Sequence, residues 1–194
     1  MVGATDANSD KQIAQSSAMI RLNVRDSNPA VPLVGFGEPD SDIALCIANR
    51  PMLDDYPLLD HLKPLAKGEL RHIVANTSNH WRKVFNVFAK FLYQLADARV
   101  HQFATWQDYR DQQLLQLGSR ETLLFSPPNL ASVSEASNGH QTIHIIAGKT
   151  YAAELNVEGL VWLDAYFAIH PTEPMIVSPY LDYPQLSTQR IDQC

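Results

Sequence analysis

The stretch Ile43-Ala44-Leu45-Cys46-Ile47-Ala48 decides the fold class. It is a short apolar run bounded by Asp42 on one side and Asn49-Arg50-Pro51 on the other. A short run that does not alternate with polar residues is typical of a strand buried on both faces, as in a parallel sheet. Thr142–Ala147 has the same character and leads into Gly148, so we expect two strands of this kind.

Helices are expected to alternate with these strands. Apolar residues recur at three- and four-residue spacing over Asn79–Arg99, with Thr77 or Ser78 as N-cap. The other expected elements are the loop Asp26–Ser41, the proline-broken stretch Leu53–His72, strands at Met19–Val24, Glu121–Phe125 and Met175–Val177, a helical turn or two at Leu130–Ser137, and helices at Thr105–Leu117, Thr150–Leu155 and Val157–Phe167. This alternation predicts an α/β fold, a three-layer α/β/α sandwich with a short, mostly parallel sheet.

The composition predicts one domain and a cytoplasmic location. Residues Met1–Ala18 are polar and aperiodic, so we expect a flexible N-terminal arm followed by a single α/β domain over 19–194. Apolar residues make up 45% of the chain, enough for a sizeable core, yet no run reaches the roughly 18 residues of a membrane helix. The start lacks a secretory signal, and the two cysteines, Cys46 and Cys194, favour a reduced compartment.

The charge is unevenly distributed. The net charge of −6 argues against a nucleic-acid partner, but His61–Val100 holds seven basic residues against Glu69 and Asp97. Two interpretations remain open. The segment is either a solvated helix face or a local patch that faces an anion.

Common cofactor and metal motifs are incomplete. Ala147-Gly148-Lys149-Thr150 resembles the end of a phosphate-binding loop, but its first glycine is replaced by Ile143. Gly35 and Gly37 lack the third glycine of a dinucleotide site. His140 and His144 lie four apart in a strand-like segment rather than on a helix. We therefore expect no cofactor and no metal.

Loops that follow parallel strands are the expected place for a site, because ligands bind beyond the carboxyl ends of such strands. Four loops qualify: Asn49–Asp55, Ser126–Asn129, Gly148–Tyr151 and Ser178–Ser187. The last is densest in polar and aromatic residues, which together can stack and hydrogen-bond a planar ligand. The alternative is a surface turn shaped by its two prolines.

Four segments, in this order, resemble motifs of the uracil-DNA glycosylase superfamily, closest to its mismatch-specific branch. They are Leu45–Pro51, Asn79–Val84, Ile145–Lys149 and Val177–Ser187. The resemblance implies that Asn49 positions or activates the attacking water, that Pro184–Ser187 wedges into DNA, and that Tyr56 is within range to stack on a flipped base. The candidate ligand-binding residues are Arg50, Tyr56, Asn79, Lys149, Ser178, Tyr180, Asp182, Tyr183, Gln185 and Ser187.

The sequence also departs from that pattern. Arg50 is an extra residue in the first motif, which lacks both family glycines, and Asp182 places a carboxylate where DNA phosphates would approach. These departures favour a diverged or inactive member that binds nucleobases or nucleic acid. The alternative is a non-enzymatic small-ligand or protein-interaction module on the same fold. Whether the chain is an enzyme, and in what oligomeric state it occurs, is left open by the sequence.

Overall fold

The structure is a computed structural model that describes residues 32–95, 98–128 and 141–181. The chain divides into Met1–Ala30 and Val31–Cys194, and only the second unit is considered below. The expected arm 1–18, the strand Met19–Val24 and the helical turns at Leu130–Ser137 lie outside the described residues.

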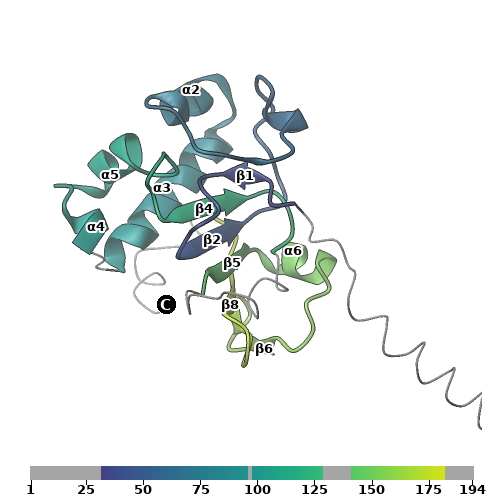
Figure 1. Cartoon of the computed structure of the whole chain (residues 1–194). Helices are drawn as coiled ribbons and strands as arrows, with labels where there is room; N and C mark the ends of the chain where they lie inside the picture. The colour runs from purple at the N-terminus through teal and green to yellow at the C-terminus, as the bar shows by residue number, and fades with distance from the viewer. Residues whose placement is uncertain (1–31, 96–97, 129–140, 182–194) are drawn as a thin grey trace, which may run out of the picture. The chain divides into compact units, whose positions relative to one another are not determined.

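The unit is built on an eight-stranded sheet in the order β3-β1-β4-β2-β5-β8-β7-β6 (Figure 1). The strands are β1 (Gly35–Phe36), β2 (Ile43–Cys46), β3 (Leu62–Lys63), β4 (Glu121–Leu124), β5 (Ile143–Ala147), β6 (Val161–Trp162), β7 (Ala168–Ile169) and β8 (Met175–Ser178). The four central strands β4, β2, β5 and β8 are parallel to one another. Antiparallel pairing is confined to the flanking pairs β1/β4, β7/β8 and β6/β7, which confirms an α/β fold with a mostly parallel sheet.

Helices pack on both faces of this sheet. They are α2 (Glu69–Asn76), α3 (Asn79–Gln94), α4 (Ala98–His101), α5 (Trp106–Gln112) and α6 (Lys149–Glu154), with a 3₁₀ turn η1 (Tyr56–Leu58). α2, α3 and α5 contribute to one core cluster, and α6 contributes to the other through Ala152. Figure 1 shows α2 to α5 gathered on one side of the sheet and α6 on the other.

The central position of strand β2 in the sheet explains why its sequence is apolar throughout. It lies between β4 and β5, and Leu45 joins the core under α3 while Ala44 and Cys46 join the core under α6. Both faces of the strand are therefore buried from solvent. The prediction of a doubly buried strand is confirmed for Ile43–Cys46, whereas Ile47 is buried beyond the end of the strand and Ala48 is exposed.

Helix α3 provides the largest apolar face. Its buried residues follow the expected three- and four-residue spacing: Trp81, Val84, Phe85, Val87, Phe88, Ala89 and Leu92. The helix ends at Gln94, five residues before the expected Arg99, and α4 is a separate helix. At α5 the Thr105 hydroxyl accepts a hydrogen bond from the backbone N–H of Asp108 at 3.1 Å, as predicted from the capping pattern.

Two expected elements are wrong. The helix expected over Val157–Phe167 is absent: the segment contains strand β6 and a turn in which the Asp164 carboxylate accepts the N–H groups of Tyr166 and Phe167. The loop expected over Asp26–Ser41 contains β1. A Cβ at Gly35 would lie 2.0 Å from the Leu123 carbonyl oxygen, so glycine permits this close strand contact.

None of the helices in the described part of the chain has the length and apolar character needed to cross a membrane.

Candidate functional site

The carboxyl ends of the four parallel strands meet at one edge of the sheet. β2 leads into Asn49, β5 leads into Gly148, and β8 leads into Pro179-Tyr180. Helix α3 begins at this edge of the sheet as well, and its second residue, His80, contacts Tyr180. Segments more than 130 residues apart in the chain thus contribute to one locus.

A hydrogen-bonded chain of three side chains links these segments. The Asn49 amide donates to the Tyr180 hydroxyl at 3.2 Å, and that hydroxyl lies 2.9 Å from Nε2 of His80. The hydroxyl can therefore accept from Asn49 and donate to His80 at once. The rings of His80 and Tyr180 lie nearly parallel, with centroids 5.5 Å apart. Asn49 is exposed to solvent, so its amide stays accessible while its orientation is held.

Gly148 forms the turn beside these three hydrogen-bonded side chains. Its φ of +99° and ψ of +136° fall in a region that residues with a Cβ rarely adopt. A Cβ there would also lie 3.3 Å from Cδ2 of Tyr180. Its N–H donates to the Ser178 carbonyl at 2.9 Å, which joins the ends of β5 and β8. Glycine at this position allows the Tyr180 ring to lie directly against the backbone.

A groove of about 370 Å³ opens next to Tyr180. Aromatic and small residues dominate its lining, with one cation and one carboxylate: Ala48, Ala147, Gly148, Lys149, Thr150, Tyr151, Glu154, Tyr166, Pro179 and Tyr180. The Lys149 ammonium lies 4.4 Å from the centroid of the Trp162 ring. Burial, reinforced by the charges of Cys46 and Glu154, raises the pKa of Tyr151 to about 12, so its hydroxyl remains a donor at neutral pH.

The predicted site residues divide into two groups. Asn49, Lys149 and Tyr180 lie at the carboxyl edge, as the strand-end rule predicted. Ser178 is also there, but it is buried and its hydroxyl donates to the Pro179 carbonyl at 3.0 Å. Asn79 is exposed, and its side-chain oxygen accepts from Nε of Arg82 at 2.6 Å.

The side chains of Arg50 and Tyr56 form hydrogen bonds within the protein instead of facing the groove. The Arg50 guanidinium donates to the carbonyls of Pro57 and Leu59, at 3.3 and 2.7 Å. Tyr56 is 2% exposed, and its hydroxyl donates to Glu69 at 2.6 Å. A ring this deeply buried cannot stack on a ligand unless the surrounding structure opens.

Four further predicted residues, Asp182, Tyr183, Gln185 and Ser187, lie outside the described residues. Within 32–95, 98–128 and 141–181, no group of three or more histidine, cysteine, aspartate or glutamate residues is arranged to hold a metal ion.

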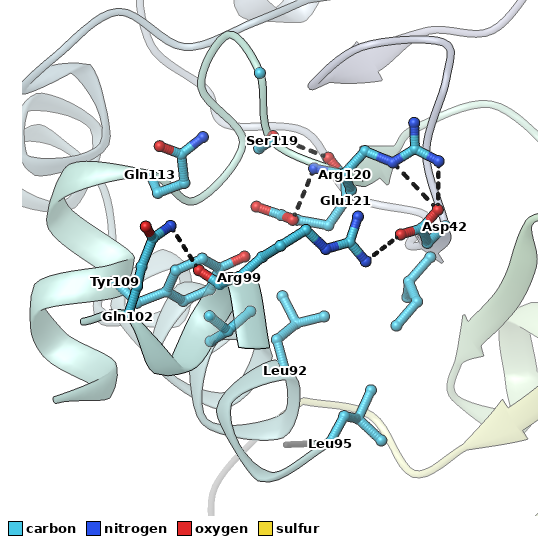
Figure 2. A pocket seen from close by; sticks show the side chains of 13 residues that line it. Asp42, Leu92, Leu95, Arg99, Gln102, Tyr109, Gln113, Ser119, Arg120 and Glu121 are labelled. Atoms are coloured by element: carbon cyan, nitrogen blue, oxygen red, sulfur yellow. Dashed lines mark hydrogen bonds and ion pairs between the residues drawn. The ribbon is translucent and has the colours of Figure 1, made fainter. Parts of the chain in front are cut away.

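A second pocket lies at the opposite edge, beside the amino ends of β2 and β4 (Figure 2). Its volume is about 420 Å³. Asp42, which precedes β2, accepts hydrogen bonds from two arginines: Arg99 at 2.5 Å, and Arg120 at 2.6 and 3.2 Å. Burial raises the pKa of Asp42, but these hydrogen bonds and charges outweigh it and hold the pKa below its ordinary value.

Glu121 lies on the floor of this pocket and is 5% exposed. Its two carboxylate oxygens accept the backbone N–H groups of Leu115 at 3.2 Å and Arg120 at 3.1 Å. Burial raises the pKa of this carboxyl group, and hydrogen bonding, first from Tyr109, only partly opposes the effect. Figure 2 shows the Glu121 carboxyl group directed toward the side of the pocket where Tyr109 lies.

His80 and Glu121 are functional candidates that the sequence alone did not reveal. His80 belongs to the quoted helix-start motif, but its contact with Tyr180 depends on residues 100 positions apart. Glu121 is a carboxylate at the first position of a buried strand, and its burial depends on packing between distant segments that the sequence pattern does not reveal.

The structure is thus an α/β domain with a groove lined by aromatic and polar residues at the carboxyl ends of its parallel strands. The chain belongs to a family of unknown function, DUF6942, which matches residues 34–194. Searches among curated proteins and among solved structures gave no match.

Proposed function

We propose that the carboxyl-edge groove binds a nucleobase or a similar planar heterocycle, and that the chain is a diverged nucleobase-binding domain. The observation that carries this proposal is the chain of hydrogen bonds from Asn49 through Tyr180 to His80, beside the groove. It holds an exposed amide in one orientation at the edge where ligands of parallel sheets bind.

The side chains around the groove suit a flat, polar ring. The amide of Asn49, which adjoins the lining residue Ala48 without itself lining the groove, offers one donor group and one acceptor, the complement of a base edge. The tyrosine rings that line the groove offer surfaces on which such a ring can stack. The four segments that resemble the uracil-DNA glycosylase superfamily all reach this edge, through Asn49, His80, Gly148 and Tyr180.

Binding is favoured over catalysis. The Asn49 amide can orient a water molecule but cannot take its proton, because an amide is not a base at neutral pH. Its hydrogen-bond partner is a tyrosine hydroxyl rather than a carboxylate. We therefore assign Asn49 to ligand positioning and treat base excision as a separate outcome to be measured.

Thermal-shift and calorimetric titrations with nucleobases, nucleosides and nucleotides test the proposal. A ligand present at 100 times its Kd should stabilise the protein by about 2.7 kcal/mol. Tyr180→Phe removes the hydroxyl that bridges Asn49 and His80, so it should weaken binding about tenfold, equivalent to one hydrogen bond of about 1.4 kcal/mol.

Tyr93→Phe is the matched control. It removes a hydroxyl that donates to the carbonyls of Phe103 and Ala104, away from the groove, and should leave binding unchanged. Excision of uracil from single- or double-stranded oligonucleotides would make the chain an enzyme. The absence of binding across the whole panel would contradict the proposal.

A protein-interaction module is the second candidate, and one observation favours it. Half of the large apolar side chains that are exposed in the described residues lie within nine positions around strands β6 and β7: Val161, Trp162, Leu163, Tyr166 and Ile169. Contiguous exposed apolar patches mark interaction surfaces. Light scattering of the purified protein tests this function, and a monomer at high concentration would argue against self-association through this surface.

A further inference from the structure

We propose that the cavity at the amino ends of β2 and β4 binds a small organic cation. Its ammonium or amidinium group would pair with the Glu121 carboxylate, and its hydrocarbon part would lie against Leu92, Leu95 and Val100. This site is independent of the carboxyl-edge groove and of the function proposed for it.

The first argument is the lack of a counter-charge at Glu121. Carboxylates are rarely this buried unless they are paired. The hydrogen bonds to this carboxylate include two from backbone N–H groups, of Leu115 and Arg120, and no Lys, Arg or His in the described ranges forms an ion pair with it. The carboxylate faces a cavity, so an occupant can supply the missing cation.

The two arginines of the pocket are directed elsewhere. Arg99 and Arg120 both donate to Asp42, and Nη1 of Arg120 also donates to Asp40 at 2.7 Å. Arg120 therefore gives Glu121 only its backbone N–H, while its guanidinium serves the aspartates. The two guanidinium charges are balanced by the two carboxylates of Asp42 and Asp40, and neither guanidinium forms an ion pair with Glu121.

The walls fit an occupant with an apolar body. Leu92 and Val100 are buried and Leu95 is 48% exposed, so together they form an apolar side that remains open to solvent. The Gln113 side chain also lines the cavity, and no hydrogen bond engages its amide within the described residues. A volume of about 420 Å³ is within the range of small-molecule sites.

Burial supports the same choice of ligand. It raises the pKa of Glu121, which means that the charged form is held at a cost in free energy. A cation beside the carboxylate offsets that cost and lowers the pKa. Binding should therefore strengthen as the pH rises through the pKa of Glu121 in the free protein.

Benzylammonium is a suitable probe, with benzyl alcohol and benzoate as neutral and anionic controls of the same shape. Backbone-amide NMR titration of the full chain at neutral pH should show saturable shifts at Leu115 and Arg120 with benzylammonium. We expect each control to bind at least about tenfold more weakly, because a desolvated ion pair is worth more than that factor.

Two variants assign the site. Glu121→Gln should weaken benzylammonium binding about tenfold while preserving side-chain shape. Leu95→Trp should block the cavity from an exposed position without disturbing the core. Leu117→Trp, at a leucine that is 76% exposed and does not line the cavity, is the matched control and should bind normally.

Several outcomes would overturn the proposal. Benzoate binding as tightly as benzylammonium would make the pocket an anion site on its arginines. Equal binding of benzyl alcohol would make it a purely apolar cavity. The proposal would also be contradicted if the Leu95→Trp variant bound benzylammonium normally, or if the natural chain showed no saturable shift with it. Both results can be obtained even if Glu121→Gln fails to fold.

Discussion

The two ends of the sheet differ in how they hold their polar groups. At the carboxyl edge, neutral side chains are hydrogen-bonded to one another and remain accessible, as in the chain from Asn49 to His80. At the amino edge, charged groups are partly buried, and Asp42 is balanced by arginines while Glu121 is not. Our two proposals follow from this difference: recognition of shape and hydrogen-bonding pattern at the carboxyl edge, and recognition of charge at the amino edge.

Removal of Asp42 should have the largest effect. Asp42→Ala leaves Arg99 and Arg120 without the carboxylate that they share at the start of β2. Breaking a fully buried pair costs about 3–5 kcal/mol, and the partial exposure of this cluster reduces our expectation to about 2 kcal/mol. Urea unfolding measures this loss. A loss below about 0.5 kcal/mol would place the cluster among ordinary surface ion pairs.

A methyl group at Gly148 tests the carboxyl edge. Gly148→Ala combines an unfavourable φ of +99° with a contact of 3.3 Å to the Tyr180 ring, so we expect a loss of about 1.5 kcal/mol and weaker nucleobase binding. Gly68→Ala is the matched control, since Gly68 has φ +86° but no atom within 4 Å of the position that a Cβ would take. It should cost about 1 kcal/mol and leave binding intact. If Gly148→Ala and Gly68→Ala changed nucleobase binding equally, Gly148 would have no specific role in the binding site.

The pH dependence of stability should have opposite signs at Glu121 and Asp42. The raised pKa of Glu121 stabilises the folded state most below the ordinary glutamate pKa, and this contribution is lost as the pH rises through the folded value. The lowered pKa of Asp42 contributes stability above the ordinary aspartate pKa, which is lost as the pH falls through its folded value.

Glu121→Gln should therefore be less destabilising, relative to the natural chain, at pH 8 than at pH 5. Unfolding free energies of both proteins at the two pH values check this smallest of the expected effects. A variant that becomes relatively less stable at pH 8 would show that Glu121 is charged and favourably paired in the folded protein.

The sequence was most informative where one short segment determines its own environment. Ile43–Ala48 and Thr142–Ala147 are apolar enough to require burial on both faces, and the strand-end rule then placed Asn49, Lys149 and Tyr180 at one edge. Helix α3 was equally readable, because its stripe of Trp81, Phe85 and Phe88 repeats at helical spacing.

Contacts between distant segments could not be read in this way. The hairpin of β6 and β7 has apolar residues on both sides of its backbone, so its spacing allowed a helix as well as a strand. The pairing of His80 with Tyr180 and the burial of Glu121 depend on tertiary packing that no local pattern encodes. Arg50 and Tyr56 were assigned to a ligand site from their positions in the chain, and packing turned both toward the interior.

Backbone-amide NMR titration of the full chain with uracil is the decisive test of nucleobase binding at the carboxyl edge. We predict saturable shifts at Asn49, Gly148 and Tyr180, with no change at Leu115 and Arg120 at the opposite edge. The absence of any saturable shift, or shifts confined to the amino edge, would contradict this assignment.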